Sequence, residues 1–254
     1  MMTIRKEHCA SKPLSATLRL LALAMVVCAV PIAAHASADD VASLYGPQPP
    51  ADATYLRVLN LSTLTAKVVL PSGARPVDLG PGAATALDVV RPGTSLQVKV
   101  DAQAPMLQPG SAPVAAGPDT VGATITLAIA HTEAGAWRAV PIAAPAASTD
   151  ALRAQLRLFN FAEGCDGKVA LERNGAQNGG PVVFEHVASR HALARSINPV
   201  AATLVAVCGD AVSAPLALPR LAAGQSYSLF LSGPASRPVL RGALDTLDWP
   251  RGAR

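Results

Sequence analysis

Aromatic side chains are scarce in this chain of 254 residues, which contains four Phe, three Tyr and two Trp. This scarcity argues against a sugar-binding platform built from several exposed rings. The phenylalanines fall at predicted strand positions, where burial of the ring in a core is the favourable arrangement. We therefore place them in the core, and the aromatic candidates outside it are Tyr45, Trp137 and Trp249.

An excess of charge of one sign is also lacking. The whole chain has 21 basic and 17 acidic residues, but four of the basic residues and one acidic residue lie within the first 36 positions. The remaining chain, with 17 basic and 16 acidic residues, is nearly neutral. No basic cluster with interleaved aromatics is present, so nucleic-acid binding is not expected. The balance also gives little electrostatic steering towards a polyanion.

Long hydrophobic runs are absent after the N-terminus. The apolar run Leu20–Val30 follows a basic segment and precedes Ala34-His35-Ala36, which has small residues at the usual cleavage positions. This pattern is typical of a secretory signal peptide, and the run is too short to span a bilayer. A lipoprotein anchored at Cys28 is the alternative, but Val27 stands where such a signal has a small side chain. We predict a signal peptide over residues 1–36 and an exported, periplasmic chain that is not membrane-spanning.

Cysteine is rare, and only Cys165 and Cys208 remain once Cys9 and Cys28 leave with the signal peptide. Two thiols in an oxidising compartment are expected to pair. A metal site is the alternative, although the two cysteines lack the CxxC spacing of metal ligands. We predict a disulfide between Cys165 and Cys208.

A repeated segment organises the rest of the chain. TYLRVLNL at Thr54–Leu61 recurs as AQLRLFNF at Ala154–Phe161, one hundred positions later. Each copy alternates apolar and polar residues, which is the period of a strand with one buried face. The repeat predicts two domains of one design, each beginning with this strand. The residues that the copies share are Leu56 and Leu156, Arg57 and Arg157, and Asn60 and Asn160.

Short apolar stretches separated by Pro- and Gly-rich turns predict an all-β fold of two tandem antiparallel β-sandwich domains. The expected parts are an N-terminal arm at 37–53, a first domain at 54–142, a linker at 143–150 and a second domain with a C-terminal tail at 151–254. Residues 102–119 lack periodicity and predict a long mobile loop. Strands are expected at 54–60, 66–70, 76–79, 85–90, 95–100, 124–130 and 137–142, and at 152–161, 168–172, 181–186, 192–197, 202–207, 212–218, 227–231 and 238–243.

Catalytic and metal-binding patterns are missing. There is no G-x-S-x-G motif and no glycine-rich loop leading from a strand into a helix. His186 and His191 flank a predicted turn beside Glu185, but no third ligand accompanies them. Asp245 and Asp248 lie near the tail and are expected to be solvated. We therefore predict no enzyme activity, no catalytic residue, no metal and no cofactor.

Four residues are candidate partner contacts. Arg57 and Arg157 are placed on the outward face of their strands, with a cross-strand ion pair or cover for apolar surface as the alternative. Tyr45 lies in the arm and Trp249 beside the basic C-terminus, where packing on the domain or simple exposure are the alternatives. Asn60 and Asn160 end their strands and are predicted to hydrogen-bond the backbone of a turn.

Several of these segments resemble the alginate O-acetylation protein AlgF family. The likeness rests on Leu44–Pro47, Leu56–Asn60, Leu156–Asn160 and Ile197–Val200, while the cysteine pair and the 102–119 insertion depart from the family pattern. The resemblance implies a non-enzymatic periplasmic adaptor. Its partners would be the membrane and periplasmic acetyltransferases that pass acetyl groups to the mannuronate residues of alginate, with contact to the polymer itself left open. The alternatives are a secreted polysaccharide-binding or matrix module and, third, a hydrolase or acyltransferase acting alone.

Overall fold

In the residues that the structure describes, the first half of the chain folds into strands, with one short 3-10 turn at Pro118–Thr120. A computed structural model describes residues 49–73, 75–146, 150–172 and 180–249, all of them within the unit Pro47–Arg254. The strands of the first half are β1 (Thr54–Asn60), β2 (Ala66–Val69), β3 (Val77–Leu79), β4 (Leu87–Val90), β5 (Lys99–Val100), β6 (Met106–Leu107), β7 (Thr124–His131) and β8 (Trp137–Ala144).

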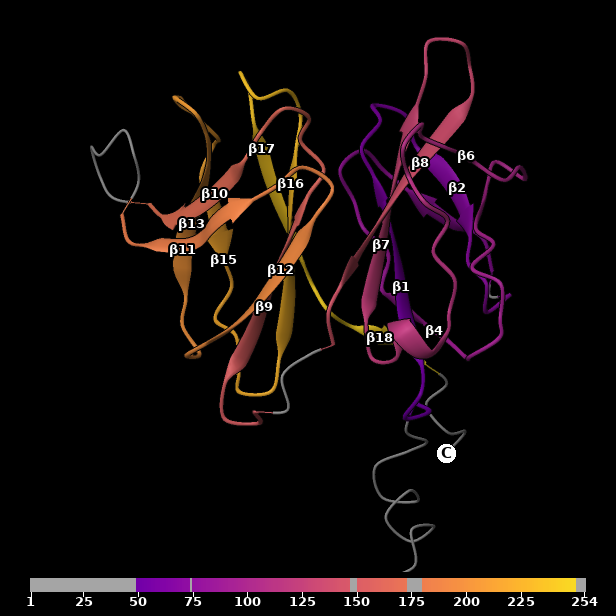
Figure 1. Cartoon of the computed structure of the whole chain (residues 1–254), viewed down its shortest axis with the longest axis horizontal. Helices are drawn as coiled ribbons and strands as arrows, with labels where there is room; N and C mark the ends of the chain where they lie inside the picture. The colour runs from indigo at the N-terminus through magenta and orange to yellow at the C-terminus, as the bar shows by residue number, and fades with distance from the viewer. Residues whose placement is uncertain (1–48, 74, 147–149, 173–179, 250–254) are drawn as a thin grey trace, which may run out of the picture. The chain divides into compact units, whose positions relative to one another are not determined.

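The second repeat has the same character, and the predicted all-β class is confirmed. A last short strand, which was not among the expected strands, returns to the first half and pairs with β4 (Figure 1). The strands are β9 (Ala154–Asn160), β10 (Gly167–Leu171), β11 (Val182–Val187), β12 (Ala192–Ile197), β13 (Ala202–Cys208), β14 (Ala211–Val212), β15 (Leu216–Leu218), β16 (Ser226–Ser232), β17 (Val239–Leu244) and β18 (Leu247–Asp248).

Each half consists of two sheets around a core. In the first half the sheet β18-β4-β1-β7-β8-β6 lies opposite β3-β2-β5, and in the second β12-β9-β16-β17 lies opposite β11-β10-β13-β14 with β15 beside β13. Leu56, Val58 and Ile125 are buried in the first core, and Leu156, Leu158 and Leu229 in the second. Whether the halves fold as independent domains stays a prediction.

The sheets are mixed rather than purely antiparallel, which corrects the expected pairing. β1 pairs antiparallel with β4 but parallel with β7, and β9 pairs antiparallel with β12 but parallel with β16. In each half the chain passes through the opposite sheet before it returns beside its first strand. Two neighbouring strands that run in the same direction cannot be joined by a tight hairpin and need a crossover connection.

The segment 102–119 is more structured than we expected of a long loop. It contains β6, which pairs in parallel with β8, and its last two residues begin the 3-10 turn at Pro118–Thr120. Ala116 within it is buried in the first core. Hydrogen bonding to β8 and burial at one point therefore tie this segment to the sheet.

Candidate functional site

The two repeats contact each other through the faces of β1 and β9 that point away from the core of their own half. Side chains alternate along a strand, so Leu56 and Val58 point to their own core while Arg57 and Leu59 point to the other side. Leu59 packs in a third cluster with Phe159 and Phe230 from the second half, and all three are buried. The rings of Phe159 and Phe230 lie 5.8 Å apart. Both faces of each repeated strand are therefore covered. The opposite sheet of the same half covers one face, and the other repeat covers the second.

Arg57 is fully buried at this junction and uses every nitrogen of its guanidinium group. Nε donates to the backbone oxygen of Thr85 at 2.9 Å, Nη1 to Asp245 Oδ1 at 2.8 Å and Nη2 to the backbone oxygen of Leu244 at 3.2 Å. Its Cζ lies 5.9 Å from the centre of the Phe230 ring, within reach of a cation–π interaction. Arg57 therefore joins the first strand of one repeat to the end of the other.

Arg157 approaches the same carboxylate from the second repeat. Its Nη1 donates to Asp245 Oδ2 at 2.5 Å and its Nη2 to Gln155 Oε1 at 3.1 Å, whereas its Nε has no partner. The hydroxyl of Ser228 also donates to Asp245 Oδ1, at 2.8 Å. One carboxylate thus accepts hydrogen bonds from both repeat arginines and from a serine. We call Arg57, Arg157 and Asp245 the arginine–aspartate cluster.

Burial and the charge of Asp245 shift the pKa of the two arginines in opposite directions. Removal from water lowers the pKa of both guanidinium groups, because desolvation disfavours the charged form, while the carboxylate of Asp245 raises them. The positive charge of Arg57 further lowers the pKa of Arg157. The Asp245 side chain is only 3% exposed, so the attraction acts in a weakly screened environment. Two buried cations therefore depend on one buried anion.

These placements revise the sequence predictions for three residues. Arg57 and Arg157 were predicted on an outward face, but that face is covered by the other repeat, so neither guanidinium lies on the surface of the described chain. The ion pair that was the alternative is present, with Asp245 as the shared acceptor. Asp245 was expected to be solvated, and its side chain is instead buried. Two arginines in apolar strands signal a buried carboxylate, but spacing alone does not say which acid supplies it.

The two repeat asparagines hold equivalent turns, as predicted. Asn60 Oδ1 accepts from the backbone N–H of Ser62, and its Nδ2 donates to the backbone oxygens of Leu64 and Leu79. Asn160 repeats the pattern with Ala162, Cys165 and Val187. Both asparagines are fully buried. Each one thus fastens the end of the first strand to a neighbouring loop and to the end of the third strand of its half.

Replacing either asparagine with alanine is expected to lower the free energy of unfolding by about 2–3 kcal/mol. Asn160→Ala leaves buried backbone groups at Ala162, Cys165 and Val187 without a partner, and unsatisfied buried groups are costly. Urea unfolding followed by circular dichroism measures the change. Asn198→Ala is the matched control, because Asn198 is exposed and its loss is expected to change little. A loss no larger than that of the control would contradict the role assigned to these amides.

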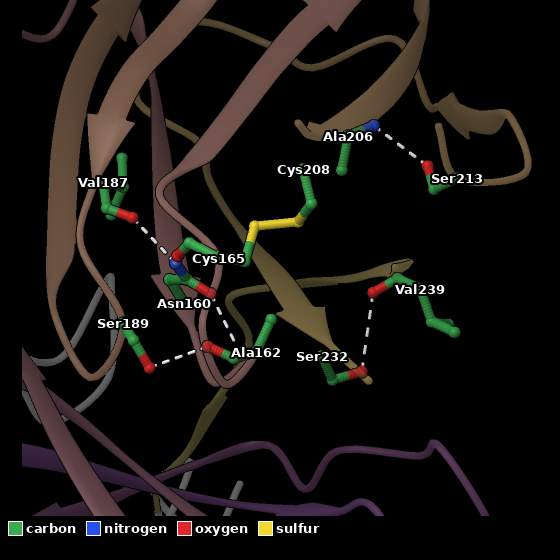
Figure 2. The surroundings of a disulfide bond; sticks show 10 residues. All are labelled: Asn160, Ala162, Cys165, Val187, Ser189, Ala206, Cys208, Ser213, Ser232 and Val239. Carbon is green, nitrogen blue, oxygen red and sulfur yellow. Dashed lines mark hydrogen bonds between the residues drawn. A yellow bond between two sulfur atoms is a disulfide. The ribbon is translucent and has the colours of Figure 1, made fainter. Parts of the chain in front are cut away.

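The predicted disulfide between Cys165 and Cys208 is present (Figure 2). Their Cα atoms lie 5.3 Å apart, within the usual range for a disulfide, and both cysteines are buried in the core of the second half. Cys208 ends β13, and Cys165 lies in the loop whose backbone Asn160 holds. The covalent link and the Asn160 amide therefore secure the same loop.

Two further sequence candidates, Trp249 and His186, lie in the described part of the chain. Tyr45 is outside the described residues. Trp249 is partly buried and lines a hollow of about 300 Å³ with Asp88 and Asp248. His186 is exposed and faces Asp166 at 3.0 Å, and this hydrogen bond raises the pKa of the imidazole. Among the residues that the structure describes, no group of three or more His, Cys, Asp or Glu side chains is arranged to hold a metal ion.

Comparison with known proteins gives weak likenesses. No family model and no curated protein matches the chain. Solved structures of the C-terminal domain of AlgF from P. aeruginosa match at 22% identity and a TM-score of 0.29, over 37% of this chain and 98% of that domain. Candidate cell adhesion proteins from Bacteroides ovatus and Bacteroides uniformis match 78% of this chain at 10% and 9% identity, covering 99% and 98% of their own lengths, with TM-scores of 0.25 and 0.22. At these scores the likenesses establish neither a family nor a function.

None of the helices in the described part of the chain is long and apolar enough to cross a membrane.

Proposed function

We propose that this protein is a non-enzymatic adaptor of the periplasm that is required for O-acetylation of alginate. In this proposal it acts through its outer surface on membrane and periplasmic acetyltransferases. It catalyses no step itself and needs no cofactor.

The observation that carries the proposal is the AlgF-like pattern in both repeats, Leu56–Asn60 and Leu156–Asn160. Its polar members form the framework of the molecule: the arginines converge on Asp245, and the asparagines hold equivalent turns. An adaptor must present two binding surfaces in a fixed position relative to each other. Side chains that join the two repeats, as these do, would hold such surfaces in place.

A deletion strain tests the proposal in the bacterium that encodes the chain. We expect the strain to export alginate in unchanged amount but without acetyl groups, as measured by proton NMR of the purified polymer. Restoring the gene is expected to restore acetylation, and so is restoring the Asp78→Asn variant, because Asp78 is exposed and forms only a surface ion pair with Lys67.

Two other outcomes would contradict the adaptor. Normal acetyl content in the deletion strain would remove the requirement. Release of acetate from an activated acetyl ester by the purified chain alone would make it an enzyme. Retention of the purified chain in an alginate affinity gel, together with normal acetylation in the deletion strain, would instead favour the polysaccharide-binding module.

A further inference from the structure

An apolar hollow of about 350 Å³ opens into the core of the first half. Its floor is the core face of the large sheet, with Leu56 from β1, Ile125 and Leu127 from β7, and Ala139 and Pro141 from β8. Its walls come from three stretches of mostly irregular backbone, at 95–98, 104–107 and 113–115. The volume lies in the range of sites that hold small molecules.

The hollow exists because the opposite sheet of this half is too small to cover the large one. β2, β3 and β5 contain four, three and two residues. In the second half, by contrast, β10, β11 and β13 contain five, six and seven residues. The irregular stretches complete the cover of the first core, and they leave a space between themselves and the floor.

The lining of the hollow is neutral. Among the described residues that line it, none is charged, and the polar side chains are those of Ser95 and Gln97. Both residues are exposed, so their polar groups can be reached from solvent. The backbone N–H and C=O groups of 95–97 form no hydrogen bond within the described part of the chain. Free donors and acceptors are therefore present beside the hollow, whereas the floor offers apolar side chains.

We propose that this hollow binds the alkyl chain of a small neutral amphiphile. The chain would lie against the floor residues Leu56, Ile125 and Leu127, where removal of apolar surface from water is favourable. A hydroxyl or amide head group would hydrogen-bond Ser95, Gln97 or the free backbone groups beside them. A charged head group is disfavoured, because no side chain of opposite charge lines the site to offset its desolvation. The site lies within one half and does not depend on the proposed function.

Titration of the chain from Ser37 onward with 1-butanol, 1-hexanol and 1-octanol tests the site, followed by carbon–proton NMR spectra of the methyl groups. We expect saturable shifts of the methyl signals of Leu56 and Ile125, while those of Leu158 and Leu229 in the second core stay unchanged. Each pair of added methylenes is expected to lower the dissociation constant at least fivefold, because every buried methylene strengthens binding several-fold. Shifts that do not saturate, or equal shifts in both cores, would overturn the proposal.

Octanoate separates the chain from the head group. It carries a similar alkyl chain with a negative charge, and it is expected to bind at least fivefold more weakly than 1-octanol at pH 8. Equal binding of octanoate and 1-octanol would overturn the choice of a neutral ligand.

Two variants of one strand locate the alkyl chain. Leu107 of β6 lines the hollow and pairs with Ala139 of the floor, whereas its neighbour Met106 lies on the other face of the strand and does not line the hollow. Leu107→Asp places a carboxylate beside the alkyl chain and is expected to weaken 1-octanol binding at least fivefold. Met106→Asp is the matched control and is expected to change the affinity less than twofold.

Both residues are exposed, so both variants are expected to keep the urea unfolding curve of the parent. Equal binding of 1-octanol by the parent and by Leu107→Asp would place the alcohol elsewhere and overturn the site.

Discussion

Replacing Asp245 with asparagine is expected to lower the free energy of unfolding by about 3–5 kcal/mol, the usual cost of removing one partner from a buried ion pair. The variant leaves Arg57 and Arg157 buried with no opposing charge, and the new amide N–H faces a guanidinium group. Because a domain is stable by only about 5–15 kcal/mol, this change removes a large part of the total. Urea unfolding, with circular dichroism and tryptophan fluorescence recorded together, measures it.

Asp78→Asn is the matched control for this prediction. Asp78 forms an ion pair with Lys67 at 3.8 Å, but both side chains are more than half exposed. Water and salt screen such a pair, so its loss is expected to cost less than about 1 kcal/mol. The same Asp-to-Asn change is thus made once in the interior and once on the surface. Equal effects of the two variants would show that Asp245 does not hold the repeats together.

A combined variant tests whether the arginine–aspartate cluster adds to the stability of the protein, or only neutralises the charges that it buries. Replacing Arg57 and Arg157 with methionine and Asp245 with leucine removes all three charges and keeps apolar contacts next to Phe159 and Phe230. Such replacements are often neutral or stabilising in other proteins, because they avoid the cost of burying ions. We expect this triple variant to be more stable than Asp245→Asn. A triple variant less stable than Asp245→Asn would mean that the hydrogen bonds of Arg57 to Thr85 and Leu244 matter more than the charge.

Loss of the Cys165–Cys208 disulfide is expected to lower the free energy of unfolding by roughly 4 kcal/mol. The cysteines are 43 residues apart in sequence, and the chain-entropy relation for a closed loop of that size gives this value. The double variant Cys165→Ala, Cys208→Ala, compared with the parent in urea without reductant, measures the loss. It also removes buried sulfur atoms from the second core, which acts in the same direction.

Reduction gives an independent check on the disulfide. Dithiothreitol is expected to shift the unfolding midpoint of the parent towards that of the double variant and to leave the double variant unchanged. Identical unfolding of the parent before and after reduction, with free thiols verified by titration, would contradict a stabilising role. The reduced form is expected to lose order first around β10 and β13, since Cys208 ends β13 and β10 pairs with that strand.

The strands were predictable where alternation and turn residues agreed. Thr54–Asn60 and Ala192–Ile197 have the predicted boundaries, and the two asparagines make the predicted turn contacts. These features depend on residues that are close together in the sequence. The strands follow from the alternation of buried and exposed side chains, and the turn contacts follow from an amide side chain next to a turn. At 95–100 the pattern was similar, yet only Lys99–Val100 is a strand, because β5 reaches its partner β2 at those two residues alone.

The candidate site was less predictable, because it depends on which surfaces meet. A strand pattern tells which side chains share a face but not what covers that face. Arg57 and Arg157 were therefore assigned to the outside, although the other repeat covers them. The parallel partners β7 and β16, and the return of β18 to the first half, follow from how the chain crosses between sheets. No local signal encodes those crossings.

By itself, the sequence determined the all-β class, the repeated strand, the paired cysteines and the asparagine turns, because each of these depends on neighbours along the chain or on a count of two thiols. The tertiary structure alone decided that Asp245 is the carboxylate shared by both repeat arginines, and that the second face of each repeated strand is buried. The physical reason is that burial and ion pairing depend on distance in space, and Arg57 is 188 residues from Asp245 along the chain but 2.8 Å from it in the fold.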